Sequence, residues 1–402
     1  MLFPSMWRLG FLFHEMAFGL FSVFLPLYII SIGGSLLDIG GMTFAASLAS
    51  IPAFFFWVTC ATNHNVINAT SYFRFYPPLF CYTFSLSTNV NVLMALYVVI
   101  SVFHAAHEPP KNVLIAEFYT REEWEKAYAL YEGFTEIGWL TGLCTGIFIF
   151  SSANFDAKTT LLICSGSNFL AFVLSLFLVA DPIIVFERGL VNIEKGVGFV
   201  HKGATLASKI LEGLPTHTRL KMENVYAFCP GGGLTLFSFA TNILLTPLPV
   251  FFSKNLNLPT CMVYAVYVSN SAASAIGYFF ASNRLERHEE RERLQMIVLM
   301  RSLFSLLFAG FTALSFGTAI FATLILTLMG FAYALYHVAV LSLSMELIPA
   351  GKAGIFDVLI SSGSAIGAFI GPFIAQTWGF TYAFLFAGMA FLLAYASFKL
   401  HS

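Results

Sequence analysis

Twelve long apolar stretches constrain this chain more than any other feature of its sequence. Each is about the 20 residues that an α-helix needs to cross the hydrocarbon core of a bilayer. They form two sets of six: 9–32, 37–60, 67–87, 90–116, 127–150 and 159–180, then 225–252, 260–282, 294–314, 317–345, 353–375 and 381–399. Because 58% of the residues are hydrophobic and 10% are charged, a water-soluble fold could not bury the apolar surface. We therefore predict an all-α integral membrane protein with twelve transmembrane helices.

The two sets of helices repeat each other in sequence. The string LPLYII, which begins at Leu25, returns as LPVFFS from Leu248, at an offset of 223 residues. The string IGWLTG from Ile137 returns as IGAFIG from Ile366, at an offset of 229 residues. Two matches in the same order and at nearly the same offset indicate a duplication. We predict two pseudo-symmetric six-helix bundles, which in membrane proteins can rock against each other around a site on their shared axis.

The chain divides into an N-terminal bundle (1–182), a polar linker (183–224) and a C-terminal bundle (225–402). Lysine and arginine concentrate in the linker and in the loops on the same side of the bilayer. The loops on the opposite side hold only Lys158 and Lys254. Because basic loops face the cytoplasm, we predict a multi-pass protein of the cell membrane with both termini and the linker in the cytoplasm.

Composition and motifs argue against several other classes of protein. The net charge of −1 does not provide the basic surface that nucleic acid requires. The six cysteines have no CxxC spacing, which favours small apolar side chains over metal ligands or disulfides. No Gly-rich phosphate loop opens a helix. We expect a monomer in the lipid bilayer that binds a small molecule and needs no cofactor, metal ion or nucleic acid.

Glycines recur at every fourth position in two of the predicted helices. They are Gly138, Gly142 and Gly146 in the stretch 127–150, and Gly363, Gly367 and Gly371 in the stretch 353–375. Small residues at this spacing let two helices approach closely and slide past each other. We therefore expect both stripes at close helix contacts.

The two six-helix repeats, the long inner linker and the glycine stripes resemble the major facilitator superfamily over nearly the whole chain. The resemblance implies a transporter that moves a small solute by alternating access. The stripe on the fifth helix looks like the packing motif of the superfamily's exporters, so export is one possible direction. The superfamily's signature loop after the second helix pairs a glycine and an aspartate with basic residues. The segment here, WVTCATNHNVINAT at 57–70, has no glycine, aspartate, lysine or arginine, so no drug-export subfamily is assigned.

Polar side chains inside the predicted helices are candidates for a solute and proton pathway, because a charge in the bilayer costs roughly 2.5–3.5 kcal/mol on insertion scales. The candidates are Glu136, Glu132, Glu15, His14, His104, Asn242, Asn270 and His337. Hydrogen bonds between helices are the structural alternative for these residues. Glu108, Lys111 and Asp357 are candidates for an inner gate. Arg74 and Arg301 are expected near the inner ends of outer helices, where long side chains extend to the headgroups.

Glu132 and Glu136 give the sharpest hypothesis. They are four residues apart, so both carboxylates lie on one face of their helix. Two carboxylates in a low-dielectric cavity cannot both ionise cheaply, so we expect one to hold its proton near neutral pH. Glu136 lies roughly 13 Å into the predicted helix, near the midplane, and is the candidate for proton coupling. Glu132 could instead pair with Lys126 or Arg121 at the inner gate.

Several alternatives to a proton-coupled transporter stay open. His104, His107 and Glu108 suggest an intramembrane metal-dependent hydrolase, because histidines three residues apart can bind one metal ion. Pro109 and Pro110 favour a kinked polar gate instead, since proline removes backbone hydrogen bonds. The same bundle could also serve as an uncoupled facilitator or as a solute sensor that signals through the linker. We expect a transporter without catalytic residues.

Overall fold

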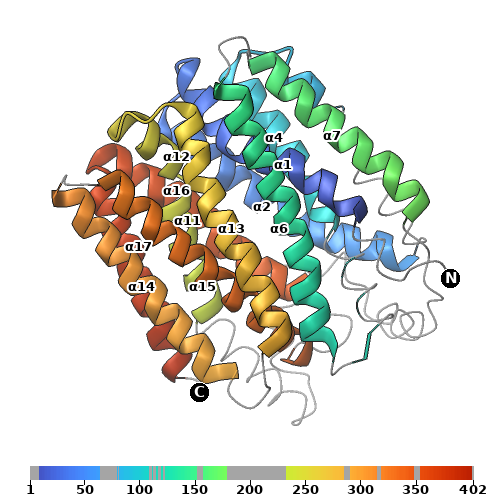
Figure 1. Ribbon diagram of the computed structural model, residues 1–402, viewed down its shortest axis with the longest axis vertical. Coiled ribbons are helices and arrows are strands. Elements are labelled where there is room, and N and C mark those ends of the chain that lie inside the picture. The colour runs from blue at the N-terminus through green and yellow to red at the C-terminus, as the bar shows by residue number, and fades with distance from the viewer. Residues whose placement is uncertain are drawn as a thin grey trace.

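The structure is a computed structural model that describes residues 9–63, 79, 81–107, 111, 115, 119–120, 123–151, 157–178, 232–284, 290–314, 318–347 and 354–400. Every regular element within these ranges is a helix (Figure 1). Nine of the described helices are long and apolar enough to cross a membrane. The linker at 183–224 and most of the predicted helix at 67–87 lie outside the described residues.

The N-terminal half follows the predicted pattern closely. Its helices are α1 (Leu9–Ser31), α2 (Leu36–Asn63), α4 (Val90–His104), the 3₁₀ turn η2 (Ala105–His107), α6 (Trp124–Ser151) and α7 (Ala157–Leu178). The stretch 90–116 was expected as one helix with a kink at Pro109 and Pro110. α4 ends at His104 and tightens into η2 just before these prolines, and Lys111 and Ile115 beyond them are helical again. Pro109 and Pro110 have no N–H for the carbonyls of residues four positions earlier, so the α-helical hydrogen bonds cannot continue through η2.

The C-terminal half departs from its prediction at one place. Its elements are α11 (Gly233–Leu245), α12 (Leu248–Val250), the π-helical turn η5 (Phe251–Asn255), α13 (Thr260–Arg284), α14 (Glu290–Leu314), α15 (Thr318–Leu347), α16 (Gly354–Thr377) and α17 (Phe380–Leu400). The stretch 225–252 was expected as one helix. Instead α11 begins after Gly232, whose φ of 96° is left-handed, and a turn at Thr246 and Pro247 separates α11 from α12. Pro247 and Pro249 cannot donate backbone hydrogen bonds there.

The same packing recurs in the two halves, as the sequence repeat predicted. α6 packs on α1, and α16 packs on α11. Five of the six stripe glycines lie against a backbone carbonyl of the other helix of their pair, with no room for a Cβ atom. The contacts are Gly138 with Leu12, Gly142 with Met16, Gly363 with Thr235, Gly367 with Phe239 and Gly371 with Ile243. The prediction of two pseudo-symmetric bundles is therefore confirmed.

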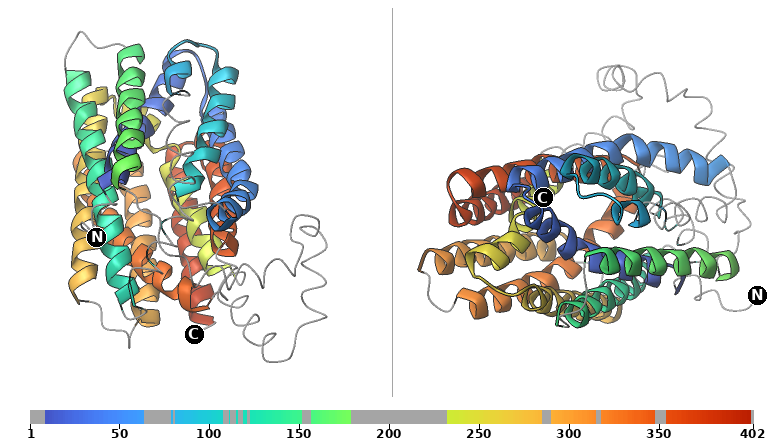
Figure 2. Two further views of the ribbon diagram at one scale, coloured as in Figure 1. Left: turned by 90° about the vertical axis from the view of Figure 1, so that its right-hand side faces the viewer. Right: turned by 90° about the horizontal axis from the view of Figure 1, so that it is seen from above.

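The two halves meet along two seams, α6 with α13 and α2 with α16. Seen from above, the blue-to-green helices of the N-terminal half lie beside the yellow-to-red helices of the C-terminal half (Figure 2). Small residues lie in both seams: Gly40 of α2 contacts Pro372, and Gly146 of α6 contacts the ring of Tyr264 on α13. The Tyr264 hydroxyl donates a hydrogen bond of 2.7 Å to the carbonyl of Leu20 on α1, which ties the halves together.

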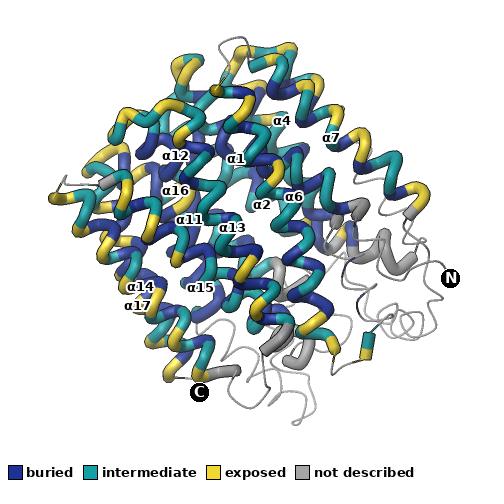
Figure 3. Tube along the Cα trace, in the orientation of Figure 1, coloured by how far each residue is buried: buried dark blue, intermediate teal, exposed yellow. Residues whose placement is uncertain are grey.

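Burial follows the arrangement expected in a bilayer. Buried positions concentrate where helices meet, and exposed positions lie mostly on the outward faces of the helices (Figure 3). Many exposed side chains are large and apolar; Phe177 is 81% exposed and Ile320 is 77% exposed. Such side chains are compatible with contact to lipid tails, and the polar groups are drawn to the interior.

Candidate functional site

A cavity of about 510 Å³ lies between the two halves. It is lined from the N-terminal half by α1, α4 and α6, and from the C-terminal half by α11, α13, α14 and α15. Seven of the eight polar residues that the sequence selected for the pathway line this cavity. They are Glu15, His104, Glu132, Glu136, Asn242, Asn270 and His337. The structure therefore gathers at one place residues that the sequence spreads over more than 300 positions.

Glu136 lies in the middle of α6, twelve residues or roughly 18 Å from the first residue of that helix. Its Oε1 atom accepts a hydrogen bond of 2.5 Å from the Ser271 hydroxyl on α13. α6 belongs to the N-terminal half and α13 to the C-terminal half, so this bond crosses a seam between the halves. Sequence reasoning did not select Ser271, because a serine in a membrane helix has many possible partners.

Glu132 lies one turn before Glu136 and has a different partner. Its carboxylate forms an ion pair of 3.1 Å with the ammonium group of Lys111, whose side chain is 1% exposed. The ammonium group also lies 5.4 Å from the centroid of the Tyr131 ring. The expected partners differ: Lys126 is exposed, and Arg121 lies outside the described residues. Because the ammonium group of Lys111 balances the negative charge of Glu132, Glu132 and Glu136 are not an isolated pair of like charges.

Lys111 was selected as a gate residue, and the structure places it in this buried ion pair. Glu108 and the side chain of Asp357, the other two gate candidates, lie outside the described residues. An inner gate built from these three residues stays a prediction.

His14 lies behind the cavity wall, where it connects α1 to α4 and α7. Its Nδ1 atom lies 2.8 Å from Oδ1 of Asn168, and its Nε2 atom lies 3.1 Å from Nδ1 of His104. The amide nitrogen of Asn168 donates to the carbonyl of Cys164 at 3.1 Å, so Oδ1 faces His14. An amide oxygen only accepts hydrogen bonds, so His14 carries its hydrogen on Nδ1.

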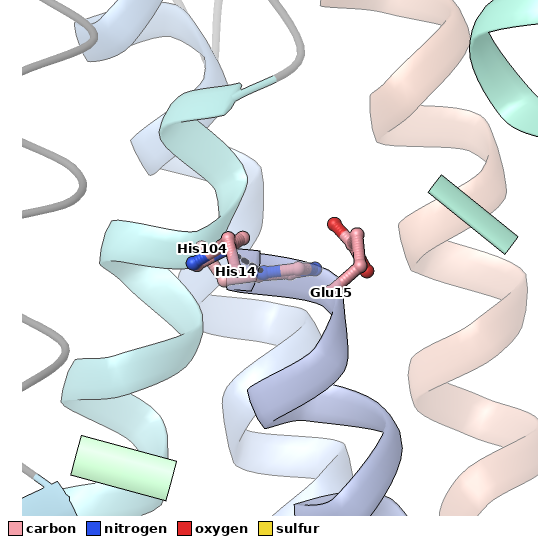
Figure 4. A group of neighbouring side chains, drawn as sticks. All are labelled: His14, Glu15 and His104. Carbon is pink, nitrogen blue, oxygen red and sulfur yellow. Dashed lines mark hydrogen bonds between the residues drawn. The ribbon is translucent and has the colours of Figure 1, made fainter. Parts of the chain in front are cut away.

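His14, Glu15 and His104 form a cluster whose metal-ligand atoms lie within 4.8 Å of one another (Figure 4). These atom types could hold a metal ion. However, both ring nitrogens of His14 already have hydrogen-bond distances to Asn168 and His104. We interpret His104, His14 and Asn168 as a hydrogen-bonded chain that leads from the cavity into the N-terminal half. For the hydrolase alternative, Glu108 and the side chain of His107 lie outside the described residues.

Arg301 lines the cavity from α14 and corrects an expectation. It was expected to extend from an outer helix to the headgroups, but its side chain is 2% exposed. It lies eleven residues, roughly 16 Å, from the first residue of α14. Its guanidinium carbon lies 4.9 Å from the ring centroid of Phe237, and 5.2 Å from those of Tyr333 and Phe391. Within the described part of the chain, Nε and Nη1 have no hydrogen-bond partner.

The remaining predicted residues of the C-terminal wall make hydrogen bonds of different kinds. The Asn270 amide donates to the carbonyl of Leu326 on α15 at 2.6 Å, which is an interhelical bond. The Asn242 amide donates within its own helix, to the carbonyl of Ser238 at 3.0 Å. Nδ1 of His337 lies 2.9 Å from the Tyr278 hydroxyl. All of these groups still line the cavity.

The sequence matches a known protein family along most of its length. The family model of the Major Facilitator Superfamily matches residues 7–356. No curated protein sequence matches the chain.

Several solved structures share its fold. The human organic anion transporter MFSD10 (TETRAN) has a TM-score of 0.71 at 13% identity, over 98% of both chains. The fucose:proton symporter FucP of E. coli, solved as a point variant, has a TM-score of 0.66 at 14% identity, over 99% of this chain and 97% of that one. The nucleoside transporter NupG has a TM-score of 0.66 at 11% identity, over 100% and 99%. At these identities the likeness establishes the fold alone.

Proposed function

The chain belongs to the major facilitator superfamily, and on that premise we propose that it is a secondary active transporter that couples solute movement to protons through Glu136. The chain is a multi-pass membrane protein of a transporter family, so solute passage through the central cavity is the expected activity. We further propose the cell membrane as its location, with both termini in the cytoplasm, which the distribution of lysine and arginine supports.

One observation carries the assignment of Glu136. The carboxylate lies on the cavity wall and is bonded across the seam to Ser271 of the other half. In alternating access the two halves must move relative to each other around the central site. A titratable group at the seam can link its protonation to that movement, because gain of a proton changes both its charge and the hydrogen bonds it makes.

The hydrogen-bonded chain of His14 and His104 supports a proton route to the cavity. His104 lines the cavity, and His14 lies directly behind it. Two imidazoles in hydrogen-bond contact can pass a proton between their facing nitrogens. Glu15, which is 8% exposed and lines the same cavity, adjoins this pair.

The proposal is tested by measuring the distances between spin labels at the two ends of the molecule. Lys158 and Lys254 are exposed positions near one end, one in each half, and Lys126 and Glu292 are exposed positions near the other. The labels would be attached to cysteines on a background without native cysteines. Between alkaline and acidic buffer, we expect the two distances to change in opposite directions in the wild-type protein.

Glu136→Gln is the decisive variant, since glutamine can still accept the bond from Ser271 but cannot titrate. We expect it to abolish the pH response of both distances, and in proteoliposomes to abolish accumulation driven by a pH gradient while exchange without a gradient persists. Glu123→Gln is the matched control, because Glu123 is exposed at the start of α6. An unchanged pH response in Glu136→Gln would remove proton coupling from this residue.

A further inference from the structure

We propose that the C-terminal wall of the cavity binds the carboxylate of an organic anion through Arg301. The inference rests on the proposed transport function and names the class of its solute. It starts from a buried cation for which the described part of the chain supplies no counter-charge.

The environment of Arg301 is unusual for a structural arginine. Arginine is almost never fully buried unless it is paired, yet this side chain is 2% exposed, and two of its nitrogens lack hydrogen-bond partners among the described residues. Rings from α11, α15 and α17 surround the guanidinium. Such rings attract a cation, but they accept no strong hydrogen bond, so the N–H groups keep their capacity to bind an oxyanion.

The carboxylates that line the cavity belong to the N-terminal half, where Glu15 lies beside His14 and His104. Glu132 is paired with Lys111, and Glu136 accepts the bond from Ser271. Along α14 itself, the nearest acidic residue is Glu292, nine residues or roughly 13 Å from Arg301. A guanidinium presents its donors in a planar fork that fits a carboxylate with two parallel bonds. A carboxylate brought by the solute would supply this counter-charge.

A second group on the same wall points to a polar ligand. Thr241 lines the cavity, and its hydroxyl is buried and has no hydrogen-bond partner among the described residues. Thr241 lies four residues after Phe237, whose ring packs on Arg301, so both occupy one face of α11. The wall therefore presents a cation and a hydroxyl that a carboxylate could engage together.

The rest of the cavity favours an organic anion over a small inorganic one. Its volume of about 510 Å³ lies in the range of pockets for drug-sized ligands. Aromatic side chains from both halves line it, namely Tyr131, Trp139, Tyr278 and Tyr333. Such rings provide apolar contact for the body of the solute, while Arg301 fixes the position of its charged end.

The test measures binding by the purified full chain in detergent, without transport. The probes are pairs of a carboxylate and its uncharged amide: butyrate with butyramide, benzoate with benzamide, and 1-naphthoate with 1-naphthamide. Titrations followed by thermal unfolding give the dissociation constants. We expect at least one carboxylate to bind about 10- to 100-fold more tightly than its amide, as a charged hydrogen-bonded contact implies. Equal binding within all three pairs would overturn the proposal.

Variants then assign the preference to Arg301. In Arg301→Gln we expect the preference for the carboxylate to disappear while binding of the amide is unchanged. Arg301→Lys keeps the charge but loses the planar fork, so the preference should fall without vanishing. Arg293→Gln, the same substitution on α14 at a residue that does not line the cavity, should behave as wild type. Full preference in Arg301→Gln, or in Arg301→Lys if the first variant does not fold, would overturn the assignment.

This test and the transport test fail separately. A protein that prefers carboxylates but shows no opposite change of the two labelled distances keeps the anion site and loses the proposed transport cycle. A protein whose labelled ends move in opposite directions but that binds carboxylates and amides equally keeps the cycle and loses the anion site.

Discussion

Asn242 of α11 occupies, in the C-terminal half, the place that Glu15 of α1 occupies in the N-terminal half. Repeat-related glycines pack on the carbonyls of Leu12 and Phe239, and the two polar residues each follow three positions later. Both line the cavity. One wall therefore presents a carboxylate where the other presents a neutral amide, although the backbones that carry them are packed alike.

The asymmetry extends to the other charged groups of the cavity. The offset of 229 residues aligns Glu136 with Ala365, so the proposed coupling carboxylate has no acidic counterpart. Buried cations differ as well: Lys111 has a carboxylate partner, whereas Arg301 is surrounded by rings. The close glycine–carbonyl contacts are therefore alike in the two halves, whereas the side chains that face the cavity differ.

The largest expected effect is the loss of the ion pair in the N-terminal half. Glu132→Gln removes the carboxylate that compensates the buried ammonium group of Lys111, and breaking a buried pair from one side costs about 3–5 kcal/mol. We expect a strongly lowered thermal unfolding temperature in detergent. The double variant Lys111→Met/Glu132→Gln should recover most of the loss. Equal stability of Glu132→Gln and the double variant would show that the unpaired ammonium group is not the cause of the loss.

The next effect probes the packing that the halves share. Gly142→Ala and Gly371→Ala each place a methyl group against a backbone carbonyl of the neighbouring helix, and overpacking of this kind costs about 1–3 kcal/mol. We expect similar losses of thermal stability in both variants. Gly310→Ala on α14 is the control, since nothing lies within 4 Å of its added Cβ. A large loss in one half alone would contradict the equivalence of the two pairs.

Leucine at Gly367 or Gly371 would place still more volume at these contacts. Because even a methyl group meets backbone atoms at both sites, we expect leucine to impair folding as well as transport. Alanine is therefore the better substitution for comparing the halves, and leucine tests only whether the bundle assembles.

A smaller effect, of opposite sign, is expected at Arg301. Replacing it with methionine removes a buried guanidinium and leaves an apolar side chain in a cage of aromatic rings. Burying a charge without a counter-charge costs free energy, so its removal should stabilise the folded protein. We expect Arg301→Met to unfold at a higher temperature than wild type and to lose carboxylate binding. A lower unfolding temperature would identify the arginine as a stabilising group, as Lys111 is in the other half.

The smallest effect concerns the bond across the seam. Ser271→Ala removes the hydroxyl that Glu136 accepts from, and a hydrogen bond of this type contributes about 0.5–1.5 kcal/mol. We expect little change in unfolding temperature but a shift in the populations of the spin-label distances between the halves. Ser269→Ala, two residues away with its hydroxyl bonded within α13, should leave those populations unchanged.

The fold could be predicted from the sequence because each spanning helix leaves its own apolar stretch, and the duplication leaves matching strings. The prediction of an unbroken helix failed where proline chemistry decides the local path, as at Pro247. Hydropathy is averaged over a window of about 19 residues, so it does not detect a helix break of two or three residues.

The cavity residues could be predicted as a set because a polar group in a membrane helix must find a polar environment. Their partners could not. Asn168 was not among the candidates, yet it fixes the orientation of His14. Arg301 was misplaced for a related reason: the topology places a helix at the outside but does not say which way a long side chain turns. The sequence signal that could have placed Arg301 correctly was the shortage of acidic residues along α14.

The unequal walls also determine how a solute can enter the cavity. In a strictly two-fold cavity, a molecule with distinct ends would have two poses of equal energy, each the other turned by half a revolution. Here Glu15, Glu132 and Glu136 lie on one side and Arg301 on the other, so the two poses differ in energy. A dipolar solute would therefore keep its head and tail in a fixed order throughout its passage.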